Sequence, residues 1–174
     1  MNIVVLAGGL STERDVSLNT GTMVSKALRS KGHNVIMLDV FMGYHEEEED
    51  ITDIFNHTEE ASADVAQIPG EAPDIAQVKA MRKDQSACFF GPNVIKICQA
   101  ADIVFMALHG ENGENGKIQA AFDLFGIQYT GSRYLGSALA MDKGISKKMF
   151  EAAGIPTPHG IACLLYTSDA ADEA

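Results

Sequence analysis

Cysteine and basic residues are scarce in this sequence, and each shortage excludes a class of protein. Only three cysteines occur in 174 residues, and the spacing of Cys88, Cys98 and Cys163 suits neither a zinc site nor a disulfide framework. Lysine and arginine number 13 against 24 aspartates and glutamates, so the formal net charge is −11. Nucleic-acid binders concentrate positive charge on one face. We therefore expect reduced cysteines and no DNA or RNA partner.

Long apolar runs are also missing. No run approaches the ~20 residues of a membrane span. Met1 leads straight into a strand-like run, with no basic segment or cleavage site before it. Hydrophobic residues still make up 46% of the chain and charged residues 21%, which is the balance of a globular protein. These features predict a cytoplasmic protein without a membrane partner, long enough for one ordinary domain.

The sequence does contain short apolar runs that alternate with segments of helical periodicity. The apolar runs, rich in β-branched residues, predict strands at 2–7, 34–40, 102–108 and 127–131. Helical spacing and end signals predict a helix that begins at Val16 and a second from Pro92, at the first helical position, to Ala101. They also predict a helix from near Lys117 to Phe125, and one or two helices over 134–154. Strand, helix and strand in this order form a right-handed βαβ unit. The predicted fold class is α/β, with an open parallel sheet.

Residues 42–90 interrupt this pattern with an acidic run and an alanine-rich stretch that contains two prolines. We interpret this segment as a surface insertion with one or two short helices. Nothing in the sequence fixes the carboxylates of residues 45–50 in a coordination geometry, so we interpret the acidic run as a solvated surface rather than a cation site.

Two polar loops follow predicted strands, Gly8–Ser17 and His109–Gly116. Ligands of open α/β sheets bind where loops converge at the carboxyl ends of the strands. The first loop lacks both the dinucleotide fingerprint and the P-loop spacing. We expect Asp15 to cap the helix that follows, which leaves Glu13 free to bind a substrate ammonium group.

The second loop places His109 directly at a strand end, and its glycines, Gly110, Gly113 and Gly116, allow a backbone to approach closely. A hydrogen-bonded structural histidine is as good an interpretation of His109 as a ligand-binding one. Glu114-Asn115 fits the cap region of the next helix. Opposite charges from two loops that face one crevice would suit a zwitterion such as an amino acid.

Three segments resemble the N-terminal domain of the D-alanine–D-alanine ligase family: "LAGGLSTERDVSLNTG", "ALHGENGENGKIQAAFDLFGIQYTGS" and "SALAMDKGISKKMFEAAGIPTP". The resemblance covers about residues 2–160 and implies a Rossmann-like domain over 1–155, a linker beginning at 156–162, and ATP-grasp domains that this chain lacks. It further implies a homodimer in which ATP, with Mg²⁺, phosphorylates the carboxylate of one D-alanine before the amine of a second attacks, for peptidoglycan synthesis.

The same resemblance implies roles for three residues. Glu13 matches the catalytic-site glutamate that holds the amino group of the first D-alanine. His109 matches the histidine that lies near the carboxylate of the same D-alanine. Lys143 matches a lysine that reaches ATP. The Mg²⁺ ligands and the arginine that stabilises the transferred phosphoryl group match nothing here, so we expect no metal ligand in this chain and no activity from it alone.

The last twelve residues, 163–174, continue neither the family pattern nor any periodicity. Cys163 to Glu173 can be back-translated into DNA that resembles a transposase mosaic-end adapter, so we interpret 163–174 as a non-native tail. The alternative is a divergent natural tail.

Three other functions stay open. The first is a ligase that uses D-lactate or D-serine as second substrate, and the second is a non-catalytic amino-acid-binding or dimerising module. The third, a nicotinamide enzyme, is less favoured because the sequence lacks its glycine fingerprint.

Overall fold

The computed structural model describes residues 1–44, 51, 53–56 and 72–160. The acidic run at 45–50 and the tail at 163–174 lie outside the described residues. The strands are β1 (Asn2–Ala7), β2 (Asn34–Asp39) and β3 (Ile103–Met106), and the helices are α1 (Arg14–Arg29), α3 (Ile75–Met81), α4 (Val94–Ala100), α5 (Glu111–Glu114), α6 (Lys117–Phe125), α7 (Tyr134–Met141) and α8 (Lys143–Ala152).

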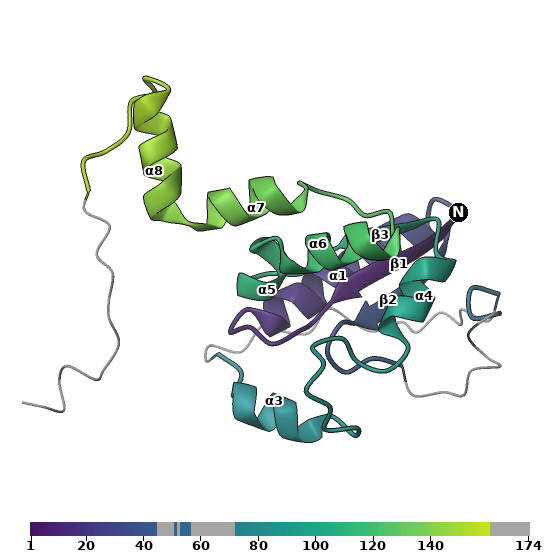
Figure 1. Cartoon of the computed structure of the whole chain (residues 1–174). Coiled ribbons are helices and arrows are strands. Elements are labelled where there is room, and N and C mark those ends of the chain that lie inside the picture. The colour runs from purple at the N-terminus through teal and green to yellow at the C-terminus, as the bar shows by residue number, and fades with distance from the viewer. Residues whose placement is uncertain (45–50, 52, 57–71, 161–174) are drawn as a thin grey trace, which may run out of the picture.

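The three strands form a parallel sheet in the order β2-β1-β3, which confirms the predicted fold class. β1 is central because its apolar run is continuous: side chains that alternate along it are buried on both faces. Val4 and Leu6 pack with α4 and α6, whereas Ile3 and Val5 pack towards α1. The sheet is thus covered by helices on both faces (Figure 1).

The predicted fourth strand at 127–131 is reduced to a single parallel bridge between Val104 and Tyr129. Two backbone hydrogen bonds flank it, from Val104 N to Gln128 O (2.8 Å) and from Thr130 N to Val104 O (3.0 Å). The segment therefore runs along β3 without forming a regular strand, and the predicted short strand at 127–131 is limited to this bridge. β3 itself is shorter at both ends than predicted.

Two predicted helix starts are also wrong. α1 begins at Arg14 rather than Val16. α4 begins at Val94, because Asn93 adopts a left-handed conformation (φ 61°) and breaks the helix after Pro92. Pro92 thus lies outside the helix that it was expected to open.

The insertion is only partly a surface feature. α3 is a short helix of the predicted kind, with Asp74 accepting hydrogen bonds from the amides of Ala76 and Gln77. Ile54 and Phe55, in contrast, are buried in the same cluster as the sheet residues. The prediction of a surface insertion is therefore wrong for Ile54 and Phe55, and for Ile51 in the same cluster.

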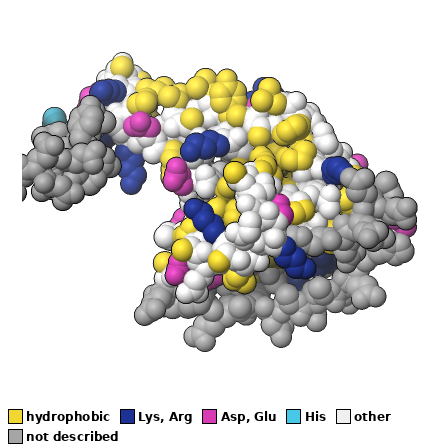
Figure 2. All heavy atoms as spheres, turned by 60° about the horizontal axis from the view of Figure 1, so that its bottom comes forward, with side chains coloured by type: hydrophobic (Ala, Val, Ile, Leu, Met, Phe, Trp, Pro, Cys, Tyr) yellow, Lys and Arg dark blue, Asp and Glu magenta, His cyan; other side chains and the backbone are white. Residues whose placement is uncertain are grey.

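Beyond the layers, α7 and α8 form an arm that reaches away from the sheet (Figure 1). Asp142 separates the two helices and accepts a hydrogen bond from Ile145 N (2.9 Å), which caps α8. Hydrophobic side chains gather along the arm (Figure 2). Among the described residues, no helix combines the length and the apolar character needed to cross a membrane.

Candidate functional site

The site is built at the carboxyl ends of β1 and β3, where the two predicted loops meet. Glu13 is the exposed residue directly before α1, and no side chain in the described part of the chain caps this helix. Asp15 lies in the first turn instead of capping it, so the expected role of Asp15 is wrong. Glu13 is exposed, but a cap by Asp15 is not the reason.

Arg14 fixes the loop that carries Glu13. Its Nη1 donates to Gly9 O (2.9 Å), and its Nη2 pairs with Oδ2 of Asp39 at the end of β2. The side chains of Arg14 and Asp39 are only 11% and 15% exposed. The other oxygen of Asp39 accepts hydrogen bonds from Phe41 N (2.9 Å) and Met42 N (3.0 Å). One carboxylate therefore holds both the β1–α1 loop and the turn after β2.

Two serines tie the β1–α1 loop to the end of β3. Ser11 Oγ donates to His109 O (2.8 Å). Ser17 Oγ, which is fully buried, donates to Ala107 O (2.8 Å) and accepts from Gly8 N (2.9 Å). These bonds satisfy backbone groups that the end of the sheet would otherwise leave unpaired. They also hold the two loops in contact.

The two loops also approach each other closely at Gly110. This residue has φ +83°, which favours glycine, and a Cβ placed on it would lie 2.8 Å from Ser11 Oγ and 3.2 Å from Glu13 Oε2. Glu13 therefore lies against the residue that follows His109. The structure brings together the loops that carry the two predicted substrate-binding residues, and we call this region the Glu13–His109 corner.

His109 is half-buried, and its ring has one hydrogen-bond partner among the residues that the structure describes. Nε2 lies 3.1 Å from Thr20 Oγ1, on the second turn of α1. Sequence reasoning assigned no role to Thr20, Arg14 or Asp39. Thr20 lies seven residues after Glu13, about two helical turns, and only that spacing could have indicated that both face the same loop.

The rest of the second loop is shaped by a short helix that was not predicted, α5. Asn115 Oδ1 accepts from Lys117 N (3.1 Å) at the start of α6, so the cap-region interpretation holds for Asn115, whereas Glu114 is the last residue of α5. Gln119, which is buried on α6, donates from Nε2 to Gly113 O (2.8 Å) and so holds the second loop against α6. Glu114 is exposed.

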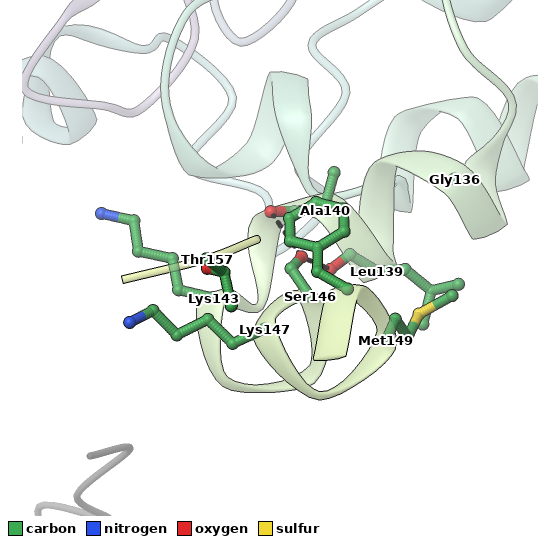
Figure 3. Close-up of a pocket in the computed structure, with 9 residues that line it drawn as sticks. Gly136, Leu139, Ala140, Lys143, Ser146, Lys147, Met149 and Thr157 are labelled. Carbon is green, nitrogen blue, oxygen red and sulfur yellow. Dashed lines mark hydrogen bonds between the residues drawn. The ribbon is translucent and has the colours of Figure 1, made fainter. Parts of the chain in front are cut away.

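Lys143 lies apart from this corner, at the start of α8 on the arm. It lines a pocket of about 550 Å³, none of whose residues belongs to the two loops. Figure 3 shows Lys143 and Lys147 extending in the same direction beside Thr157. Lys147 Nζ donates to Pro158 O (2.7 Å). Leu139, Met149 and other apolar residues line the remainder, so the wall of the pocket is mainly apolar.

Ionisation is perturbed at three described groups away from the corner. Burial raises the pKa of the Cys98 thiol to about 12. Burial, with a hydrogen bond to Asp123, raises the pKa of Tyr129. A side-chain hydrogen bond from Arg82 lowers the pKa of Asp84. Within residues 1–44, 51, 53–56 and 72–160, no group of three or more His, Cys, Asp or Glu could hold a metal ion.

Comparison with known proteins identifies the family of this chain. The family model for the D-ala D-ala ligase N-terminus matches residues 2–132. A D-alanine–D-alanine ligase of Lacticaseibacillus casei (strain BL23) is 45% identical over 160 residues, covering 90% of this chain and 43% of that protein. One from Pediococcus pentosaceus is 47% identical over 158 residues, covering 90% of this chain and 44% of that protein. The chain belongs to the D-alanine–D-alanine ligase family, and it spans less than half the length of these relatives.

Solved structures agree with the fold. The D-alanine–D-alanine ligase from Bacillus anthracis complexed with ATP has a TM-score of 0.55 and 26% identity, covering 91% of this chain and 39% of that one. The VanG D-Ala:D-Ser ligase from Enterococcus faecalis has a TM-score of 0.54 and 29% identity, covering 91% of this chain and 43% of that one. The resemblance noted in the sequence is thus confirmed by sequence and structural comparison.

Proposed function

We propose that this chain is the part of an ATP-dependent D-alanine–D-alanine ligase that holds the first D-alanine. The observation that carries the proposal is the contact at Gly110, which brings the loops of Glu13 and His109 together at the carboxyl end of the sheet. Acceptors and donors from two loops then face one small ligand, as the binding of an amino-acid zwitterion requires.

The roles follow from charge. The Glu13 carboxylate accepts hydrogen bonds from the ammonium group of D-alanine, and the His109 ring stabilises its carboxylate end. Arg14, Asp39, Ser11 and Ser17 touch no substrate in this proposal. They hold the two loops at a fixed separation, so that the ligand meets a preorganised site.

ATP fits the arm rather than the corner. Lys143 and Lys147 extend together from a pocket with an apolar wall, and such an arrangement suits a phosphate chain beside an apolar group (Figure 3). ATP would supply the phosphoryl group that activates the carboxylate of D-alanine. From the family resemblance, we propose that the Mg²⁺ site lies in the part of the longer protein that this chain does not contain.

The test is a chimera in which residues 1–160 replace the matching segment of the Lacticaseibacillus casei relative. We expect phosphate release from ATP that depends on D-alanine, and none from the present chain alone. A folded chimera that binds D-alanine but releases no phosphate would favour the binding-module alternative. A folded chimera that neither binds D-alanine nor releases phosphate in its presence would contradict the proposal.

A D-Ala:D-Ser ligase is the second candidate, because the Enterococcus faecalis structure matches nearly as well as the D-alanine enzyme. The corner would bind the first D-alanine in either case, so the two candidates differ in the second substrate. The native full-length protein, assayed with D-serine or D-lactate beside D-alanine, separates them.

We propose further that the protein works as a homodimer and that residues 163–174 are not native. Exposed apolar side chains on α6 and α7, among them Leu124 (89% exposed) and Leu135 (56%), support an interface. The mass of the native protein in solution tests the homodimer.

Sequencing the source DNA beyond the codon of Ala162 tests whether residues 163–174 are native. Recovery of the same ending with a stop codon from independent clones would overturn the proposal of a non-native tail.

A further inference from the structure

Thr20 has one hydroxyl hydrogen and two acceptors within reach. Its Oγ1 donates to Val16 O (2.9 Å), four residues earlier in α1, and lies 3.1 Å from His109 Nε2. A threonine in a helix commonly donates to the carbonyl of residue i−4. Because a hydroxyl carries a single hydrogen, Thr20 then presents only lone pairs to the histidine.

The hydrogen between Thr20 and His109 must therefore come from the ring. The 3.1 Å separation falls within the range of about 2.7–3.2 Å for an N–H donor and an oxygen acceptor. In the described residues, no other hydrogen bond reaches the ring. Nε2 is thus bound to the scaffold, and Nδ1 is left as the ring atom that can interact with a ligand.

We propose that Thr20 is a positioning residue that fixes the orientation and the tautomer of His109. It holds the ring through Nε2–H and leaves Nδ1 for the substrate, so that Nδ1–H of the doubly protonated ring is the donor to the D-alanine carboxylate. The proposal rests on the proposed function only for the identity of that substrate, because the hydrogen bond exists without ligand. Fixing a histidine through its second nitrogen is a general way to set which nitrogen acts.

Thr22 provides a matched control on the same helix. Its hydroxyl also donates to a carbonyl four residues earlier, Leu18 O (2.9 Å), but its other contact is with Met37 Sδ (3.7 Å) and not with His109. Thr22→Val therefore removes the same kind of helix bond as Thr20→Val and leaves the His109 ring untouched.

The first experiment records long-range proton–nitrogen NMR spectra of the present chain with ¹⁵N-labelled histidine. Five histidines are present, and His109→Gln assigns the signal of interest. We expect hydrogen on Nε2, unprotonated Nδ1 in the neutral ring, and an Nε2–H proton protected from solvent exchange. Thr20→Ser and Thr22→Val keep this protected signal, and Thr20→Val loses it.

Two results would overturn the proposal. A neutral ring with hydrogen on Nδ1 in the unsubstituted chain would mean that Thr20 donates to His109, and this test needs no variant to fold. A protected Nε2–H that persists in folded Thr20→Val would mean that another group holds the ring.

A second readout uses the chimera and separates this inference from the proposed function. Loss of one hydrogen bond of ordinary strength predicts that Thr20→Val raises the KM for D-alanine about three- to tenfold, whereas Thr20→Ser and Thr22→Val stay near the unsubstituted value. A chimera that does not use D-alanine would overturn the proposed function and leave the NMR result standing. A KM for D-alanine raised equally by Thr20→Val and Thr22→Val would reduce Thr20 to a structural role.

Discussion

Arg14 and Asp39 form a nearly buried ion pair that joins the start of α1 to the end of β2, one residue away from Glu13. Its position explains how an exposed glutamate in a glycine-rich loop can have a defined location, because the neighbouring side chain is anchored to the sheet.

Asp39→Ala is expected to lower the free energy of unfolding by about 2–4 kcal/mol, since it leaves the Arg14 guanidinium largely desolvated and without its carboxylate. It also removes the acceptor for two backbone amides after β2. Chemical denaturation of the chain measures the loss. Lys117→Ala, which breaks the exposed pair with Glu111 (70% and 71% exposed), is the control and should cost less than about 0.5 kcal/mol. Equal costs would contradict the anchoring role.

Gly110→Ala is expected to weaken D-alanine binding, because the new Cβ would collide with Ser11 and approach the Glu13 carboxylate. Gly126 is the matched control: it also has positive φ (+69°), but nothing lies within 4 Å of a Cβ placed there. Both variants strain the backbone by about 1–2 kcal/mol, and only Gly110→Ala disturbs the corner. The KM for D-alanine of the two chimeric variants provides the comparison. A similar KM in both would show that the close approach at Gly110 is unimportant for the substrate.

Cys98 is expected to resist thiol reagents in the folded chain. Burial raises its pKa to about 12, so almost none of it is the reactive thiolate at mildly alkaline pH. Cys88 is exposed and should react at once. Labelling a Cys163→Ala variant before and after addition of denaturant measures the difference, and rapid labelling of Cys98 without denaturant would contradict its place in the core.

Tyr129 is expected to make stability fall at high pH. Its pKa is raised in the folded state, so the neutral phenol stabilises the fold below the unfolded pKa of about 10, and this contribution is lost as pH rises through the folded value. Tyr129→Phe should flatten that part of the stability curve. An unchanged alkaline slope in Tyr129→Phe would contradict the prediction.

The sequence was sufficient for the parallel order of β1, β2 and β3 and for the two loops at the end of the sheet. β1 and β2 were recognisable because their apolar runs are continuous and end at turn residues, and the two loops followed from the rule for the carboxyl ends of parallel strands. The helix starts were not recognisable in the same way. Asn93 adopts a left-handed conformation that a local pattern does not reveal, and α1 starts at Arg14, whose side chain pairs with Asp39, 25 residues away.

The supporting contacts of the site were also hidden from sequence. Thr20 meets His109 across 89 positions, and Ser17 meets Ala107 across 90. Such contacts depend on the packing of α1 against the sheet, which periodicity predicts only as a buried face. The residues expected to touch substrate were visible because their chemistry is unusual in a turn, whereas the residues that position them are ordinary serines and threonines.

The most direct test of the account is the KM and kcat/KM for D-alanine of the chimera carrying Glu13→Gln, compared with Glu111→Gln. Glu111 is an exposed glutamate in the neighbouring loop, and its only ion pair in the described chain is the exposed one with Lys117. Loss of a charged hydrogen bond to the ammonium group predicts that Glu13→Gln lowers kcat/KM about ten- to a hundredfold, while Glu111→Gln changes it little. Equal kinetic constants for the two variants would contradict the claim that Glu13 holds D-alanine.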